Sequence, residues 1–206
     1  MAAELPRFEP LTLEGRWVRL EPMSRDHLAA LSVAGADASI WTWLHAAYET
    51  AERMAVWIDD ALKGQEQGTM LPFVQVERAT GTVVGSTRYL AIERAHRRAE
   101  IGYTWIHPRW QRSAINTEAK YLLLTHAFEA LGLNRVEFKT DFLNDKSRNA
   151  LARIGAQQEG VFRKHMIAAS GRVRDTVYFS ITNTDWPSVK ARLEAMMAKY
   201  SGAKAA

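Results

Sequence analysis

The residues best suited to chemistry are concentrated between Glu100 and Lys120, in the sequence EIGYTWIHPRWQRSAINTEAK. This stretch predicts a buried strand, a short polar turn that carries Arg109 and Arg112, and the first turns of an amphipathic helix. A helix N-terminus presents unpaired backbone N–H groups and the positive end of a dipole, so it suits an anionic group such as phosphate. The turn therefore predicts a site for a phosphorylated molecule. The alternative is an ordinary connection between a strand and a helix.

Strands and helices are predicted on both sides of this turn. Apolar patterning and turn residues predict strands at 16–23, 71–77, 82–91, 100–107 and 135–140, and a closing hairpin at 157–168 and 172–182. Helical spacing and capping residues predict helices at 24–33, 50–67, 117–131 and 144–154, and a last helix that opens at Asp185. The strand–helix–strand run over 100–140 is a crossover unit, which requires parallel neighbouring strands.

Length and composition favour one domain over 1–206, with frayed ends at 1–10 and 200–206. The chain has no cysteine, which excludes disulfides, thiolate metal sites and a cysteine nucleophile and fits a cytoplasmic location. It has no apolar run of about 18 residues, so no membrane span is expected. The N-terminus MAAELPRFEP has no apolar core of a secretory signal.

Positive charge gathers around the same turn. Six arginines (Arg88, Arg94, Arg97, Arg98, Arg109 and Arg112) stand against Glu93 and Glu100 within a chain of formal charge +4. Such a patch suits a nucleotide cofactor or nucleic acid, or is simply solvated surface. Neither a helix-turn-helix nor an RNP-like aromatic strand is present, so nucleic acid is the least favoured partner. The histidines lack ligand spacing, so no metal site is expected.

A family resemblance rests on two segments. The sequence IHPRWQRSAINTEA resembles the cofactor-binding segment of the GNAT acyltransferases, and in particular the RimJ/RimL branch of ribosomal-protein N-acetyltransferases. The segment FLNDKSRNALARIGAQQEGVFRKH resembles that family's Asn-x-x-Ser helix and the strand after it. The match runs through about 81–179 in order and spacing, and several weak motifs at matching intervals are far more specific than one.

The resemblance implies an α/β fold with a mixed sheet of about seven strands and helices on both faces. Two parallel strands would splay apart, and acetyl-CoA would lie in the gap with its pyrophosphate on the turn. Ile106 and His107 would pair with the pantetheine arm as a pseudo-strand, and Asn144 would hydrogen-bond it. The implied cofactor-binding residues on the turn are Arg109, Gln111, Arg112, Ser113, Ala114, Ile115, Asn116 and Thr117.

The turn departs from the family pattern at three positions. Arg112 and Ala114 stand where glycine is common, and Asn116 replaces a small residue. Glycine is favoured there because the backbone must approach phosphate closely and adopts positive φ readily. The departures keep open an alternative function, a non-catalytic module that binds acyl-CoA.

Acetyl transfer to an amine needs a base for the amine proton and an acid for the leaving thiolate. Glu100 is the candidate base, acting through a water; the alternative is a carboxylate paired with Arg98 or Arg88. Many GNAT enzymes use a tyrosine as the acid, but Leu151 occupies the corresponding position. Ser147 is therefore the candidate acid, and its alternative is a helix hydroxyl bonded to its own backbone.

The resemblance implies that the acceptor is a primary amine, either a protein N-terminus or a small molecule. Trp41 and Trp43 lie between the first two helices, where related enzymes close over the acceptor, and Arg88 is a third substrate candidate. Core packing is the alternative for the two tryptophans. Dimers are frequent among relatives, so the resemblance allows a homodimer, with the C-terminal helix as one interface.

Overall fold

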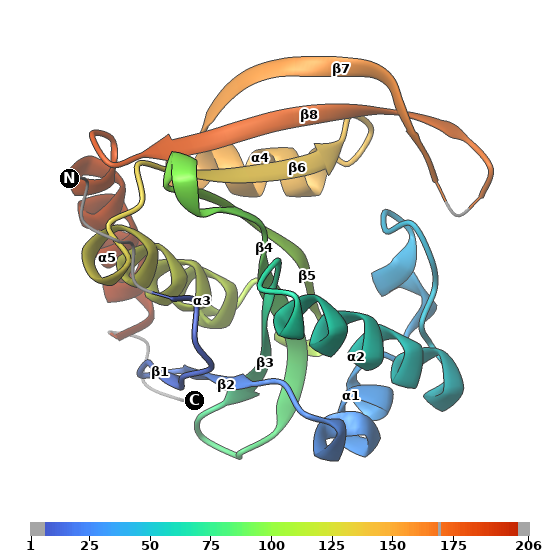
Figure 1. Ribbon diagram of the computed structural model, residues 1–206. Helices are drawn as coiled ribbons and strands as arrows, with labels where there is room; N and C mark the ends of the chain where they lie inside the picture. Colours follow the sequence, from blue (N-terminus) through green and yellow to red (C-terminus); the bar gives the residue numbers. More distant parts are fainter. Residues whose placement is uncertain (1–6, 169, 202–206) are drawn as a thin grey trace.

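The strands form one eight-stranded mixed sheet in the order β1-β2-β3-β4-β5-β6-β8-β7. A computed structural model describes residues 7–168 and 170–201 (Figure 1). The strands are β1 (Leu13–Glu14), β2 (Val18–Pro22), β3 (Leu71–Glu77), β4 (Val83–Glu93), β5 (Arg98–Ile106), β6 (Arg135–Asp141), β7 (Gln157–Ile167) and β8 (Val173–Thr182). β5 and β6 run parallel, as the crossover unit predicts, and the other neighbouring strands of the sheet run antiparallel. The additional strand is β1, which is too short for an alternating pattern to reveal it.

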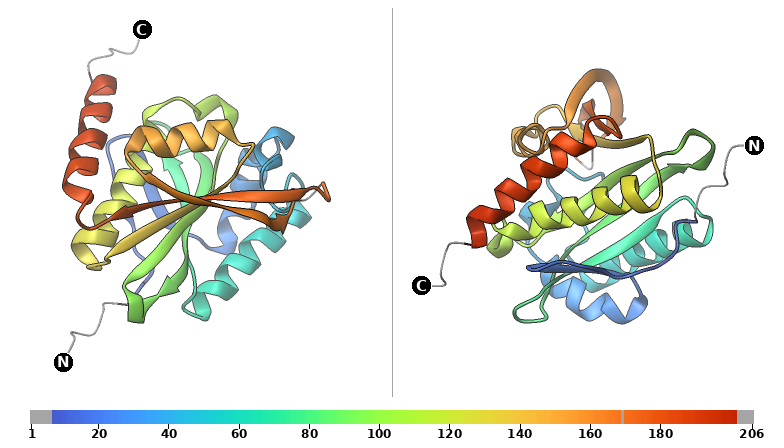
Figure 2. Two further views of the ribbon diagram at one scale, coloured as in Figure 1. Left: turned by 90° about the horizontal axis from the view of Figure 1, so that it is seen from above. Right: turned by 90° about the vertical axis from the view of Figure 1, so that its left-hand side faces the viewer.

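Helices cover both faces of the sheet. They are α1 (Leu28–Ala34), α2 (Ala51–Glu66), α3 (Ala114–Thr125), α4 (Asp145–Ile154) and α5 (Trp186–Ser201); α3 continues through a π-helical turn at His126–Ala130. α1 and α2 lie on one face, and α3 and α5 pack together on the other (Figures 1 and 2). α4 contacts β6, β7 and α5. Among the described residues, no helix is long and apolar enough to cross a membrane.

The alternation of apolar residues along the strands produces two cores, one under each helical layer. In β3, Phe73 belongs to the core beneath α3 and α5, whereas Val74 belongs to the core beneath α1 and α2. Both side chains are fully buried. In α2 the residues at helical spacing, Met54, Trp57 and Ile58, complete the second core. The mixed sheet therefore separates two layers of helices, in agreement with the predicted fold class.

A buried carboxylate on α3 fixes the start of β2. Glu118 accepts hydrogen bonds from the backbone N–H groups of Arg16 (2.7 Å), Trp17 (2.6 Å) and Val18 (2.8 Å). A Cβ at Gly15 would lie 2.4 Å from the same carboxylate, so glycine is required for this close approach. Glu118 lies in the segment IHPRWQRSAINTEA that resembles the family's cofactor-binding segment, and its contacts here are structural.

The ends of the described chain pack against the fold. Phe8 lies edge to face against Tyr89, with ring centroids 5.4 Å apart. Tyr200 contacts the ring of Trp17 at 6.3 Å. Aromatic contacts thus place Phe8 and Tyr200 against the fold, and the fraying expected at 1–10 and 200–206 stays a prediction. Residues 1–6 and 202–206 lie outside the described part.

Candidate active site

β5 and β6 pair over only three residues and then separate. The paired positions are Arg98–Glu100 and Arg135–Glu137, and the rest of β5 continues without β6 beside it. At the far end of β5, Ile106 lies opposite Gly85 of β4, and its C=O accepts from Gln111 Nε2 at 2.9 Å. The N–H of His107 instead donates to Val84 O at 2.8 Å. The N–H of His107 is therefore engaged within the fold, and the pairing of Ile106 and His107 with the pantetheine arm stays a prediction.

The turn after β5 leaves backbone donors free. Ser113 caps α3, since its Oγ accepts from Ile115 N at 3.3 Å. The N–H groups of Arg112, Ser113 and Ala114 make no hydrogen bond to any part of the chain that the structure describes. Arg112 has a φ of 61°, so it holds the left-handed position that glycine usually takes. Three adjacent free donors at a helix N-terminus fit a pyrophosphate.

α3 begins at Ala114, three residues before the predicted start at Thr117, because Ser113 is the cap. Ala114, Ile115, Asn116 and Thr117 are therefore its first turn rather than a loop, and neither Ala114 nor Asn116 has positive φ. The side chains of Ala114, Ile115 and Thr117 are buried, so these three residues present backbone rather than side-chain groups. The departures at Ala114 and Asn116 cause no backbone strain here.

The turn and the start of α4 meet at one edge of the sheet. Both follow the carboxyl ends of the parallel strands β5 and β6, where α/β folds gather their ligand-binding residues. Lys146 of α4 contacts Gln111 Oε1 directly, and Arg109 and Arg112 are exposed nearby. Lys146 adds a positive charge beside the turn. It was not predicted from the sequence, although it lies inside the Asn-x-x-Ser segment.

Asn144 is the N-cap of α4. Its Oδ1 accepts from Ser147 N at 3.0 Å, whereas its Nδ2 makes no hydrogen bond to the described residues. The Oγ of Ser147 has no partner among them either, so the alternative of a hydroxyl bonded to its own backbone is not what the structure contains. Asn144 thus combines a structural acceptor with a free donor.

The two functions of Asn144 are separable by mutation. Asn144→Ala is expected to lower the free energy of unfolding by about 1 kcal/mol, because the cap is lost. Asn144→Ser keeps a capping oxygen and loses the amide donor. We expect both variants to bind acetyl-CoA roughly five-fold more weakly, in calorimetry, because one hydrogen bond is lost. Unchanged affinity in Asn144→Ser would remove Asn144 from the binding site.

Glu100 is buried and lies beside a lysine. Its Oε2 is 2.7 Å from Lys139 Nζ, an ion pair without good hydrogen-bond alignment. Burial raises the pKa of the Glu100 carboxyl, and Lys139 offsets this only in part. Neither arginine that the sequence offered as an ion-pair partner of Glu100 pairs with it. Arg98 pairs with Glu137, and Arg88 lines the pocket beside α2 that is described below. A raised pKa suits a general base, which works best near the operating pH.

A second buried ionisable group, Lys120, lies on the α3 side of the sheet. Its Nζ donates to Thr104 Oγ1 at 2.8 Å, and it lies 5.7 Å from the centroid of the Phe138 ring. No carboxylate forms an ion pair with it in the part of the chain that the structure describes. Burial lowers the pKa of the Lys120 ammonium from 10.5 to about 7.

Lys120→Met is expected to stabilise the protein at neutral pH and to do so less at higher pH. Between pH 7 and 10.5 the unfolded chain holds the proton that the folded chain has released, so wild-type stability rises with pH. The difference in the free energy of unfolding between variant and wild type should decrease by roughly 2 kcal/mol from about pH 7 to 9. Denaturant unfolding at several pH values measures it, with the exposed Lys199→Met as the control. A difference in the free energy of unfolding that does not change with pH would contradict a buried Lys120 with a lowered pKa.

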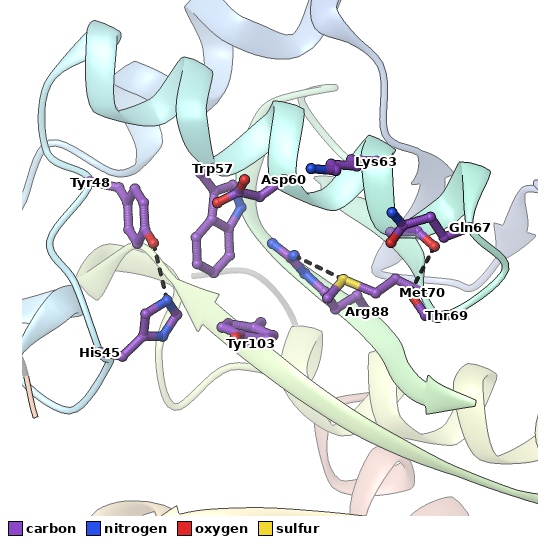
Figure 3. A pocket seen from close by; sticks show the side chains of 11 residues that line it. His45, Tyr48, Trp57, Asp60, Lys63, Gln67, Thr69, Met70, Arg88 and Tyr103 are labelled. Atoms are coloured by element: carbon purple, nitrogen blue, oxygen red, sulfur yellow. Dashed lines mark hydrogen bonds between the residues drawn. The ribbon is translucent and has the colours of Figure 1, made fainter. Parts of the chain in front are cut away.

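A pocket opens between α2 and the strands β4 and β5 (Figure 3). Its cavity volume is about 250 Å³. A β-bulge in β5, where Tyr103 has a φ of 48°, turns that tyrosine toward the pocket. The lining residues are His45, Tyr48, Trp57, Asp60, Lys63, Gly64, Gln67, Thr69, Met70, Arg88 and Tyr103.

The three substrate candidates have different places. Arg88 lines the pocket. Trp41 is 3% exposed and packs in the core, where its Nε1 donates to Gly35 O at 2.8 Å. Trp43 is half-buried and does not line this pocket. Core packing thus accounts for Trp41. Tyr103 lines the pocket but was not predicted to, because the alternation of apolar and polar residues along β5 does not reveal the bulge.

A family model described as an acetyltransferase (GNAT) domain matches residues 18–157. The chain belongs to the GNAT acetyltransferase family. Members of this family take the acetyl group from acetyl-CoA, and the diverging strands, the free donors of the turn and Asn144 fit that co-substrate. The predicted family and fold are thereby confirmed.

Individual relatives support the RimJ/RimL-like branch. The chain is 36% identical over 110 residues to YdaF of Bacillus subtilis, named as a candidate ribosomal N-acetyltransferase; the match covers 53% of this chain and 59% of YdaF. It is 31% identical over 137 residues to the N-acetyltransferase p20 of Bacillus licheniformis, with 66% and 74% covered. The matches to YdaF and to the N-acetyltransferase YoaA of Bacillus subtilis thus span less than two thirds of those proteins.

Solved structures agree over more of the chain. A GCN5-related N-acetyltransferase from Brucella melitensis superposes with a TM-score of 0.87 at 33% identity, covering 94% of this chain and 88% of that one. Mycobacterium smegmatis RimJ, in complex with CoA-disulfide, gives 0.76 at 26% identity, with 87% and 88% covered. The roles of individual residues in this chain stay predictions.

Proposed function

We propose that this chain transfers the acetyl group of acetyl-CoA to a primary amine by direct attack in a ternary complex, and that the amine is a protein N-terminus. The observation that carries the proposal is the gap between β5 and β6, with the free N–H groups of Arg112, Ser113 and Ala114 at its end. The names of YdaF and RimJ favour a protein acceptor over a small-molecule amine.

Each residue of the site has a role in this proposal. The backbone of Arg112–Ala114 would bind the pyrophosphate, with Arg109, Arg112 and Lys146 supplying charge. The backbone of Ile106 and the Nδ2 of Asn144 would hold the pantetheine arm. Acetyl-CoA supplies an activated thioester when bound. Glu100 would accept the amine proton through a water, and Ser147 Oγ would donate a proton to the leaving sulfur.

Turnover on a panel of acceptors tests the proposal. Release of free CoA is followed with peptides that carry a free N-terminus, with the same peptides N-terminally blocked, and with a polyamine. The proposal predicts release with the free peptides and none with the blocked ones. Release with the polyamine alone would move the acceptor to the small molecules. Cofactor binding with no release on any amine would favour the non-catalytic module instead.

The remaining predictions concern partners and location. A homodimer is proposed from the family resemblance and is tested by light scattering during size-exclusion chromatography. A cytoplasmic location is proposed from the composition and is tested by cell fractionation. Nucleic acid stays the least favoured partner, and binding that falls steeply with salt would be its signature.

A further inference from the structure

Arg88 is a buried cation without an anionic partner. It is 2% exposed, and its guanidinium lies between two rings, 4.3 Å from the centroid of Trp57 and 4.5 Å from that of Tyr103. Among the described residues no carboxylate forms an ion pair with it. Within the described part of the chain, the guanidinium donates only from Nη1 to Met70 Sδ, at 3.5 Å. Burial lowers the pKa of Arg88 to about 10, which leaves it charged at neutral pH.

The unpaired atoms of Arg88 define a docking edge. Nε and Nη2 are buried and have no hydrogen-bond partner. These two nitrogens form one side of the planar guanidinium, and their N–H groups point in parallel. That edge matches the two oxygens of a carboxylate in a bidentate pair. A buried charge left unpaired is costly, so an edge of this kind suits a ligand that completes it.

The pocket around Arg88 fits a small ligand with charges of both signs. Trp57, Tyr103 and Tyr48 provide apolar walls, and Tyr48 Oη is 3.2 Å from His45 Nε2 (Figure 3). Asp60 of α2 lies at the exposed rim and offers a negative charge near the mouth. A cavity of about 250 Å³ has room for a group of amino-acid size. A single guanidinium favours a monoanionic carboxylate over a phosphate dianion.

We propose that Arg88 binds a carboxylate of the acceptor, so that the acceptor is a primary amine that also carries a carboxylate. The inference rests on the proposed acetyl transfer to a primary amine and narrows the class of that amine, whether it belongs to a peptide or to a free amino acid. Tyr103 joins the two parts of the site, because it stacks on Arg88 and lies on β5 close to Glu100 and to the gap. The carboxylate has two sources: the terminal carboxylate of a free amino acid, or an acidic side chain near the N-terminus of a peptide.

Calorimetry with matched ligand pairs, without acetyl-CoA, tests the inference. One pair is alanine and alanine amide; the other is the dipeptide amides alanyl-glutamate and alanyl-glutamine. We expect at least one carboxylate ligand to bind roughly ten-fold more tightly than its neutral partner, as one charged hydrogen-bonded pair provides. The pair that shows the difference identifies the source of the carboxylate.

Variants assign the effect to Arg88. Arg88→Met should abolish the difference within the pair, and Arg88→Lys should reduce it, since lysine keeps the charge without the bidentate edge. The control is Arg25→Met, which replaces an exposed arginine that pairs with Asp59. This variant should retain the full difference in affinity within the pair of ligands. Thermal melting checks that each variant is folded, and the wild-type comparison holds even if Arg88→Met does not fold.

The outcomes separate this inference from the proposed function. Equal binding within both pairs, no binding by any of the four ligands, or a difference that survives in folded Arg88→Met would overturn the carboxylate site. Acetyl transfer to neutral amines would then still stand. An Arg88-dependent difference without turnover on any amine would support the carboxylate site and count against acetyl transfer.

Discussion

Replacing Glu118 with alanine is expected to lower the free energy of unfolding by roughly 3 kcal/mol, because three backbone donors lose a charged acceptor. Glu118 is 5% exposed, and the hydrogen bonds from Arg16, Trp17 and Val18 to its carboxylate are 2.6–2.8 Å long. The variant would leave a cavity beside Gly15 and N–H groups at the start of β2 without a partner. Equilibrium unfolding in denaturant measures the loss.

Two further variants sharpen this test. Glu118→Gln keeps the shape but turns a donor toward backbone donors, so it should also destabilise the protein. Glu66→Ala, on the exposed end of α2, should change stability little. A loss below about 1 kcal/mol in Glu118→Ala would mean that water replaces the carboxylate and that the anchor contributes little.

Replacing Glu100 with glutamine is expected to slow acetyl transfer at neutral pH roughly 100-fold, because an amide cannot accept the amine proton. The KM for acetyl-CoA should change little, since Glu100 lies on the paired part of β5 and not on the turn. Steady-state rates over a range of pH measure the effect. The surface variant Glu93→Gln makes the same chemical change at an exposed position and should leave the rate unaltered.

The pH profile identifies the titrating group. The Glu100 pKa is raised, so the wild-type rate should fall as the pH drops through a value above 4.5, where the carboxylate takes up a proton. Glu100→Gln should lack that limb. Lys139→Met removes the nearby ammonium and should move the limb to higher pH. The same limb in Glu100→Gln would assign the base to another group.

Much of the fold was predictable because local signals and the global topology agree. Leu71–Glu77 was predicted with its observed ends. Gly132 and Gly155 have positive φ where helices were expected to end, and Thr50 caps α2. The parallel pairing of β5 and β6 follows from the length and position of the intervening helix.

The missing details depend on contacts between distant segments. The ion pair of Glu100 with Lys139 requires knowing how β5 and β6 lie beside each other, which the sequence does not state. The Arg88 pocket depends on a bulge at Tyr103 that breaks the two-residue period of β5. Trp41 and Arg88 were both substrate candidates, and both are buried. They differ in hydrogen bonding: the polar group of Trp41 has a partner inside the fold, whereas Nε and Nη2 of Arg88 have none among the described residues.

Calorimetric titration of the purified protein with acetyl-CoA, with free CoA as the comparison, tests the central claim most directly. The gap between β5 and β6, the free donors of Arg112–Ala114 and the amide of Asn144 predict submillimolar binding of acetyl-CoA. Weaker binding in Asn144→Ser would place the ligand at this edge of the sheet. No binding of either ligand by the folded protein would mean that the turn with Arg112 in the left-handed position does not hold a pyrophosphate, and would contradict the proposed acetyl transfer.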